Sequence, residues 1–218
     1  MAHPLYLQLL QAPDVRLIVS QVQAALDDEA RRRMAFYDWL TPDIKAEFIN
    51  GEVVMHSPAR NIHLQVSGRL FVLLHSWVVA RGLGEVHTEK ALVSLTRNDY
   101  EPDICFWGQA KAALFTDDTM RYPAPDLIVE VLSPSTEARD RGVKFQDYAA
   151  HGVAEYWIVD PAAQTIEPYR LVAEQMQYEG GTPLPLHARV SSVVVPGFDI
   201  AVQAVFEEAA NLQALQGR

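Results

Sequence analysis

The segment Asp126-Leu-Ile-Val-Glu-Val-Leu132 is a nearly unbroken apolar run with one acidic residue, Glu130, inside it. A run of this length and composition is typical of a strand in the middle of a sheet, where both faces are covered. A carboxylate in such a strand is costly unless it is paired, hydrogen-bonded or bound to a cation. Glu130 therefore marks the segment both as the centre of the fold and as a candidate functional position.

The sequence on either side predicts more strands and helices. After Ser133-Pro134 we expect a helix over 137–150, a strand over 155–160, strands near 165–171, 175–179 and 190–195, and a final helix from 202. Before the segment, Asn50-Gly51 predicts a hairpin over 46–56. A helix should follow from 62, with Asn61 as its N-cap and Gly82 at its end. Strands should then occupy 84–95 and 101–107.

Residues 5–40 have helical apolar spacing, and Pro13 should divide them into two short helices. The acidic run 27–29 followed by the basic run 31–33 indicates a solvated helix face. These strands and helices predict the α/β fold class. An N-terminal helical extension (1–35) should precede the main domain with its C-terminal helix (36–218).

Composition narrows the classes of function. The chain has 218 residues and a net charge of 18 − 28 = −10, which argues against a protein that coats nucleic acid through a broad basic face. The single cysteine, Cys105, excludes an intramolecular disulfide and a cysteine-rich zinc site. No apolar run approaches the roughly 20 residues of a membrane helix. With no signal peptide recognisable, a cytoplasmic location and no membrane partner are expected.

Four polar residues stand where the pattern predicts apolar ones. Asp103 follows Pro102 at the start of a strand, Glu130 lies inside the apolar strand, Lys144 lies on the next helix, and His63 lies at the start of the helix from 62. Two carboxylates on neighbouring strands can hold a hard cation such as Mg²⁺, with Mn²⁺ as the alternative. A nearby lysine can orient or deprotonate water and balance charge on a phosphate.

Pro102-Asp103, Glu130 and Lys144 resemble the PD-(D/E)xK nuclease signature, except that Leu132 stands where the lysine usually does. The wider sequence resembles the Uma-two family of that superfamily, whose lysine is displaced onto the following helix. The resemblance covers about residues 36–200 and is carried by the following segments: 47–52, His63, 101–104, 126–135, Lys144 with Tyr148, and 152–161. It implies a restriction-endonuclease-like core, that is, a mixed β-sheet flanked by helices, with the strands of Asp103 and Glu130 adjacent. It also implies metal-dependent phosphodiester hydrolysis.

On this basis the expected catalytic residues are Lys144, Asp103, Glu130 and His63, and the expected metal ligands are Asp103, Glu130 and Glu52. Arg139, Arg141 and Tyr148 are candidates for substrate binding. Each of these residues could instead have a purely structural role. Lys144 in particular could form an ordinary helix-surface pair with Asp140, four residues earlier.

The favoured function is an Mg²⁺-dependent endonuclease acting on DNA. One alternative is a catalytically silent nuclease-fold module for binding or assembly, which the acidic balance favours. A second is a phosphoesterase on small nucleotides or RNA. A homodimer is also expected, because cleavage of two strands needs two sites and two-fold symmetry is the commonest way to supply them.

Overall fold

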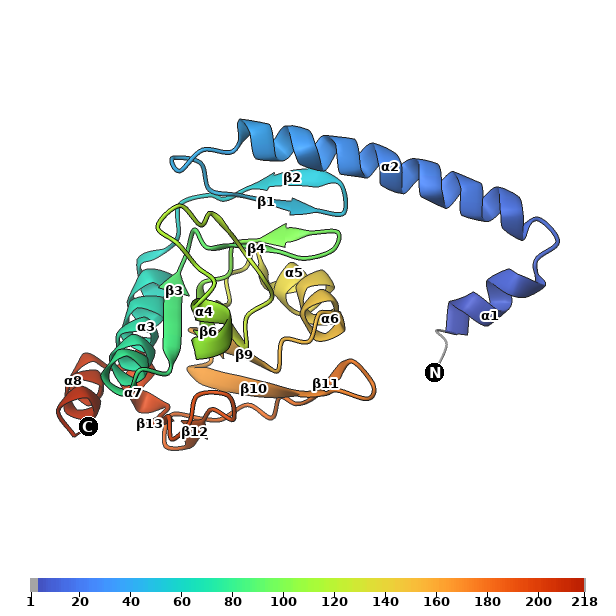
Figure 1. Cartoon of the computed structure of the whole chain (residues 1–218). Coiled ribbons are helices and arrows are strands. Elements are labelled where there is room, and N and C mark those ends of the chain that lie inside the picture. Colours follow the sequence, from blue (N-terminus) through green and yellow to red (C-terminus); the bar gives the residue numbers. More distant parts are fainter. Residues whose placement is uncertain (1–3, 218) are drawn as a thin grey trace.

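The computed structural model describes residues 4–217, and its centre is a six-stranded mixed sheet (Figure 1). The strands are β3 (Gly84–Thr88), β6 (Ile104–Gly108), β8 (Leu127–Val131), β9 (Glu155–Asp160), β10 (Thr165–Val172) and β11 (Gln177–Gly180). Their order is β11-β10-β9-β8-β6-β3, with β8 and β9 parallel and the other pairs antiparallel. The apolar strand is therefore interior, and the predicted adjacency of the Asp103 and Glu130 strands is confirmed.

A second, five-stranded sheet lies beside the first, in the order β2-β1-β5-β4-β7. Its strands are β1 (Ala46–Ile49), β2 (Glu52–Met55), β4 (Leu92–Ser94), β5 (Asp99–Tyr100) and β7 (Arg121–Tyr122). The predicted hairpin is β1–β2. Its turn residues have positive φ, 50° at Asn50 and 84° at Gly51, as a tight two-residue turn requires. A short pair, β12 (Arg189–Ser191) and β13 (Asp199–Ala201), completes the strands described here.

Helices flank these sheets and precede them. They are α1 (Pro4–Gln11), α2 (Val15–Trp39), α3 (Asn61–Arg81), α4 (Gln109–Ala112), α5 (Glu137–Asp140), α6 (Val143–Ala150), α7 (Gln203–Phe206) and α8 (Glu208–Gln216). Pro13 separates α1 from α2 as predicted, although α2 is long. Helix α2 also runs unbroken across the expected boundary between residues 35 and 36.

The two faces of the central sheet have different partners. Leu127, Val129 and Val131 of β8 belong to the core cluster formed with α3, whereas Ile128 belongs to the cluster that contains Tyr148 of α6. Side chains alternate between faces along a strand. Glu130 therefore faces the side on which α6 lies.

Helix α3 is long and apolar enough that length and composition alone would allow it to cross a membrane. A core helix passes the same test, and the apolar side chains of α3 do pack in the core with β8, α7 and α8. Its C-terminus is at Gly82, in the left-handed conformation, as predicted. Asn61 is not its cap: the N-cap residue is Arg60, which makes no side-chain capping bond.

The helix predicted over 137–150 is divided into α5 and α6. Gly142, at the break, has φ −112° and ψ −102°, which is not helical. A Cβ atom at this position would lie 2.6 Å from the carbonyl oxygen of Ala138, so the backbone approach needs glycine. The break starts α6 at Val143 and puts Lys144 in its first turn.

Candidate active site

A cavity of about 260 Å³ collects the polar residues that the sequence singled out. Its walls include His63 in the first turn of α3, Asp103 immediately before β6, Glu130 in β8, and Lys144 in α6. The loop after β2, the loop after β8 and helix α5 supply most of the other lining residues. Distant parts of the chain therefore meet around one cavity.

Asp103 and Glu130 meet across the antiparallel pair β6–β8. Ile104 pairs with Val129, so the next position in the register sets Asp103 against Glu130. The Val131 N–H donates to Asp103 Oδ2 at 2.7 Å, and His63 Nε2 lies 3.1 Å from Asp103 Oδ1. Both carboxylates line the same cavity, as predicted.

Lys144 is buried among carboxylates, with only 3% of its surface exposed. Its Nζ lies 2.8 Å from Glu47 Oε1, 2.9 Å from Glu130 Oε1 and 3.6 Å from Asp140 Oδ1. The alternative of a solvated surface pair is therefore wrong, because both Lys144 and Asp140 are buried. Burial alone would lower the pKa of Lys144, but these carboxylates outweigh it and raise that pKa well above its usual value.

Glu130 is the buried acid of the site. Burial raises its pKa well above the usual value, and the nearby Lys144 only partly opposes this effect. The Tyr148 hydroxyl donates to Glu130 Oε1 at 2.9 Å, beside the bond from Lys144. Tyr148 is fully buried and is not among the residues that line the cavity, so its contact with substrate stays a prediction that this position does not favour. It holds Glu130 in place instead.

The acid that the N-terminal hairpin contributes is Glu47. Burial would raise its pKa, but Lys144 and His56 outweigh burial and lower that pKa to about 2. Glu52, the predicted ligand from this hairpin, is exposed beside the turn and does not line the cavity. Glu47 lies between the buried Ala46 and Phe48 in β1. An acid inside a predicted strand was the sequence signal that could have identified it, as it identified Glu130.

The two candidate arginines have different environments. Arg139 lines the cavity, and its Nε is buried without a hydrogen-bond partner. Arg141 lies outside the cavity and donates to both carboxylate oxygens of Glu167 at 2.7 Å. The contact of Arg141 with a phosphate stays a prediction, and this pairing outside the cavity does not favour it.

Sequence reasoning missed several other residues of the cavity. Lys45, His56 and Arg60 add positive or titratable groups to its wall, and Glu101 adds a carboxyl group. Glu101 Oε2 is buried without a hydrogen-bond partner, and burial raises the pKa of Glu101 to about 7. These residues occupy loops next to strands or, for Arg60, the N-cap of α3, where periodicity gives no signal.

The carboxylates of the cavity suit a metal ion that binds few protein ligands. Among the described residues, no group of three or more His, Cys, Asp and Glu side chains is arranged to hold a metal ion. Asp103 and Glu130 nevertheless provide two carboxylates in one cavity, and Mg²⁺ commonly takes one or two carboxylates with water and substrate phosphate. The residues fit an open site of this kind, in which Lys144 competes with a cation for Glu130.

Comparison with known proteins agrees with this geometry. A family model named Uma2 and described as "Putative restriction endonuclease" matches residues 33–203. The chain belongs to the Uma2 family. The match includes every cavity residue discussed above and begins within α2, so α1 and most of α2 precede it.

The fold has a relative among solved structures. The chain is similar to a crystal structure from Anabaena variabilis described as "a putative nuclease belonging to DUF820". The TM-score is 0.66 at 18% sequence identity, and the match covers 78% of this chain and 94% of that chain. This likeness shows a shared fold. No curated protein matches the chain.

Proposed function

We propose that this Uma2 protein is a divalent-metal-dependent endonuclease that hydrolyses phosphodiester bonds in DNA. The observation that carries the proposal is the meeting of Asp103, Glu130, Lys144 and Arg139 around one cavity. Two acids, a buried ammonium and a guanidinium there match the needs of phosphoryl transfer, in which positioning and neutralisation of charge dominate.

Asp103 and Glu130 would hold the cation, Mg²⁺ or Mn²⁺. When bound, such an ion supplies a Lewis acid and lowers the pKa of a coordinated water. In the reaction, a water oxygen bonds to phosphorus and gives up one proton to solvent, one P–O ester bond breaks, and the departing oxygen takes a proton from solvent.

The protein residues divide the remaining tasks. Lys144 is an ammonium because its pKa is raised, so it acts by stabilising negative charge and orienting water, and not as the base. His63 orients Asp103 through its 3.1 Å contact. Arg139 is placed to bind a phosphate oxygen.

A specific observation favours a second candidate, the catalytically silent module. Lys144 already pairs with Glu47 and Glu130, and the net charge of −10 disfavours a broad nucleic-acid interface. In that case the ion pairs would only hold α6 against the sheets. A cleavage assay separates the two candidates.

The assay should use supercoiled, linear and single-stranded DNA, RNA and a small phosphodiester, each with Mg²⁺, Mn²⁺ or EDTA. We expect metal-dependent nicking of DNA by the wild type and a loss of at least about 100-fold in Glu130→Gln, because removing a group that acts in the transition state costs about 3 kcal/mol or more. Glu52→Gln is the matched control and should cleave like the wild type. If only RNA or only the small phosphodiester were cleaved, that compound and not DNA would be the substrate.

Metal binding and chemistry can be measured apart. A cation that binds the folded site raises the melting temperature by mass action. We expect this rise in the wild type and in Lys144→Gln, and no rise in Asp103→Asn. Lys144→Gln should lose cleavage but keep the metal response. Wild-type turnover in Lys144→Gln would remove Lys144 from the catalytic residues, whereas no cleavage by any form of the protein would support the silent module.

A further inference from the structure

Residues 4–26, which we call the N-terminal arm, comprise α1 and the first half of α2. Helix α1 contains no charged residue, and between residues 4 and 26 the charged residues are Asp14 and Arg16. Large apolar side chains of the arm are nevertheless exposed, among them Leu5, Leu10, Leu17, Val19, Val22 and Leu26, by 42–67%. The apolar residues of α1 occupy most of its circumference, with Gln8 and Gln11 on the remaining side. A helix with so wide an apolar surface is normally packed against a partner, and one of eight residues is marginal in water.

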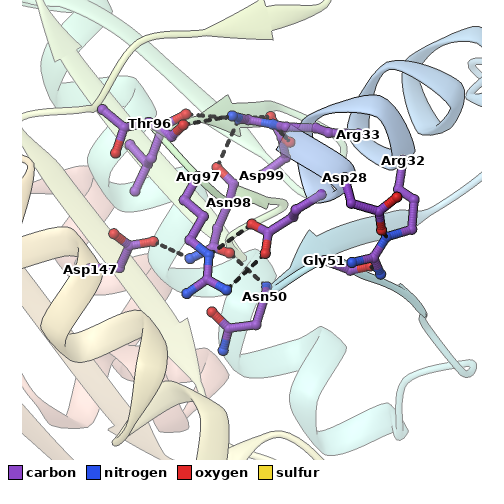
Figure 2. A network of polar contacts seen from close by, with 12 residues as sticks. Asp28, Arg32, Arg33, Asn50, Gly51, Thr96, Arg97, Asn98, Asp99 and Asp147 are labelled. Atoms are coloured by element: carbon purple, nitrogen blue, oxygen red, sulfur yellow. Dashed lines mark hydrogen bonds and ion pairs between the residues drawn. The ribbon is translucent and has the colours of Figure 1, made fainter. Parts of the chain in front are cut away.

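The uncovered surface of the arm continues an interface that α2 already makes. At 100° per residue, Val19, Val22 and Leu26 lie on the same face as Glu29 and Arg33. Those two residues attach the second half of α2 to the protein by ion pairs with Arg97 and Asp99 (Figure 2). The free half of α2 extends past the sheets, with α1 turned back at its end (Figure 1).

We propose that the N-terminal arm pairs with the same arm of a second copy of this chain. The two α2 helices run antiparallel about a two-fold axis near Gln21 and Val22, and the two α1 helices cover their flanks. The resulting bundle of four helices buries α1 on several sides, as its composition requires.

Charge complementarity sets this register. Arg16 and Asp27 are eleven residues apart, so they lie within about 20° of each other around α2. Both are exposed, and Asp27 accepts a hydrogen bond from Gln23 at 2.7 Å. Antiparallel pairing centred between residues 21 and 22 places Arg16 beside Asp27 of the partner subunit, and the reverse pair forms at the other end.

The size and chemistry of the arm suit a second copy. Nine large apolar side chains in the arm are exposed by 37–67%. Burying them removes roughly 500 Å² per copy, or about 1,000 Å² in the pair, the size at which an interface becomes specific. A helix that binds a lipid surface carries several Lys or Arg residues on its polar face. The arm has only one such residue, Arg16, and the net charge of the chain is −10. A lipid surface is therefore a less suitable partner than a second copy.

Sedimentation equilibrium of the full chain from 1 to 100 μM tests the proposal. We expect a dimer whose dissociation constant rises at least about 100-fold in Val22→Asp, which buries a charge beside the axis. The matched control is Leu114→Asp, which should not change the dissociation constant. Leu114 follows α4, outside the arm, and its side chain is 76% exposed. Circular dichroism melting verifies that each variant keeps its fold.

The register has its own test. Arg16→Asp and Asp27→Arg should each weaken the dimer about tenfold, because each puts like charges together at both ends of the pair. The double variant should return to within about threefold of the wild type. A monomer at 100 μM, a dimer insensitive to Val22→Asp, or no recovery in the double variant would overturn the proposal. Binding of the wild type to phosphatidylcholine or phosphatidylglycerol vesicles, lost in Val22→Asp while the protein remains monomeric, would also overturn it.

Discussion

Glu130 shows what a single residue in the sequence can reveal. An acid inside an apolar strand has few uses, so its position alone predicted burial and a raised pKa, and both are found. The same reasoning applies to Glu47 between Ala46 and Phe48. That acid was missed because Glu52, five residues later in the same hairpin, looked equivalent in a sequence without spatial information.

Glu101, two residues before Asp103, has a predictable effect on stability. Its pKa is raised by burial to about 7 from 4.5, so between these values the folded chain holds a proton that the unfolded chain releases. The contribution of Glu101 to stability is therefore fully present below pH 4.5 and is lost as the pH rises through 7.

Glu101→Gln removes this titration. We expect the variant to have a free energy of unfolding about 2 kcal/mol higher than the wild type at pH 8, and little different at pH 4.5. Urea unfolding at both pH values measures the change. Glu52→Gln, at an exposed glutamate, is the control and should have nearly the same free energy of unfolding as the wild type at both pH values. A variant that is equally stabilised at both pH values would show that burial of a charge is not the cause.

At the scale of elements, the order of strands and helices followed from the sequence better than their ends did. The apolar strand, the Asn-Gly hairpin and Gly82 as a helix end are local signals, and each was correct. The break at Gly142 depends on a close approach to Ala138, and the cavity depends on contacts between segments far apart in sequence. Periodicity contains neither kind of information.

Arg139 in α5 and Arg141 at the C-terminal end of that helix are two arginines that the sequence could not distinguish. Arg139 lines the cavity, whereas Arg141 is held by Glu167 and Glu137. Each was an equal candidate for binding phosphate. Their environments now predict opposite consequences for the same substitution.

Arg139→Ala should raise KM for DNA about tenfold or more with a small change in stability, because a guanidinium contact to phosphate contributes a few kcal/mol to binding. Arg141→Ala should keep the wild-type KM and lower the free energy of unfolding by about 1–2 kcal/mol, since a bidentate, partly exposed pair is lost. Steady-state cleavage and urea unfolding measure both. Equal effects of the two substitutions on KM would contradict the assignment of Arg139 to the cavity.

At the scale of the whole molecule, α2 joins the N-terminal arm to the side of the protein on which α6 lies. The charged run 27–33 was predicted to be a solvated face, and Asp28 with Arg31 and Arg32 does form exposed pairs. Glu29 and Arg33, however, point to the turn between β4 and β5. Asn98 in that turn donates to Asp147 of α6 at 2.7 Å, so a polar network continues from α2 to the helix that carries Lys144 (Figure 2).

Arg33 is the residue on which this attachment depends most. Its guanidinium donates to both oxygens of Asp99, at 2.6 and 2.8 Å, and to the carbonyl oxygens of Leu95, Thr96 and Asn98. The side chain of Asp99 is fully buried. Removing one member of a buried pair leaves a charge that water cannot reach.

Arg33→Ala should therefore lower the free energy of unfolding by about 3 kcal/mol or more and expose α2 to amide hydrogen exchange along its second half. Arg31→Ala is the matched control in the same helix. Its side chain is 70% exposed and pairs only with Asp28 among the described residues, so we expect a change of at most about 1 kcal/mol. If both variants were equally stable and α2 remained protected in Arg33→Ala, apolar packing of Phe36 on Phe48 would suffice to hold the helix, and the network from α2 to α6 would contribute nothing measurable.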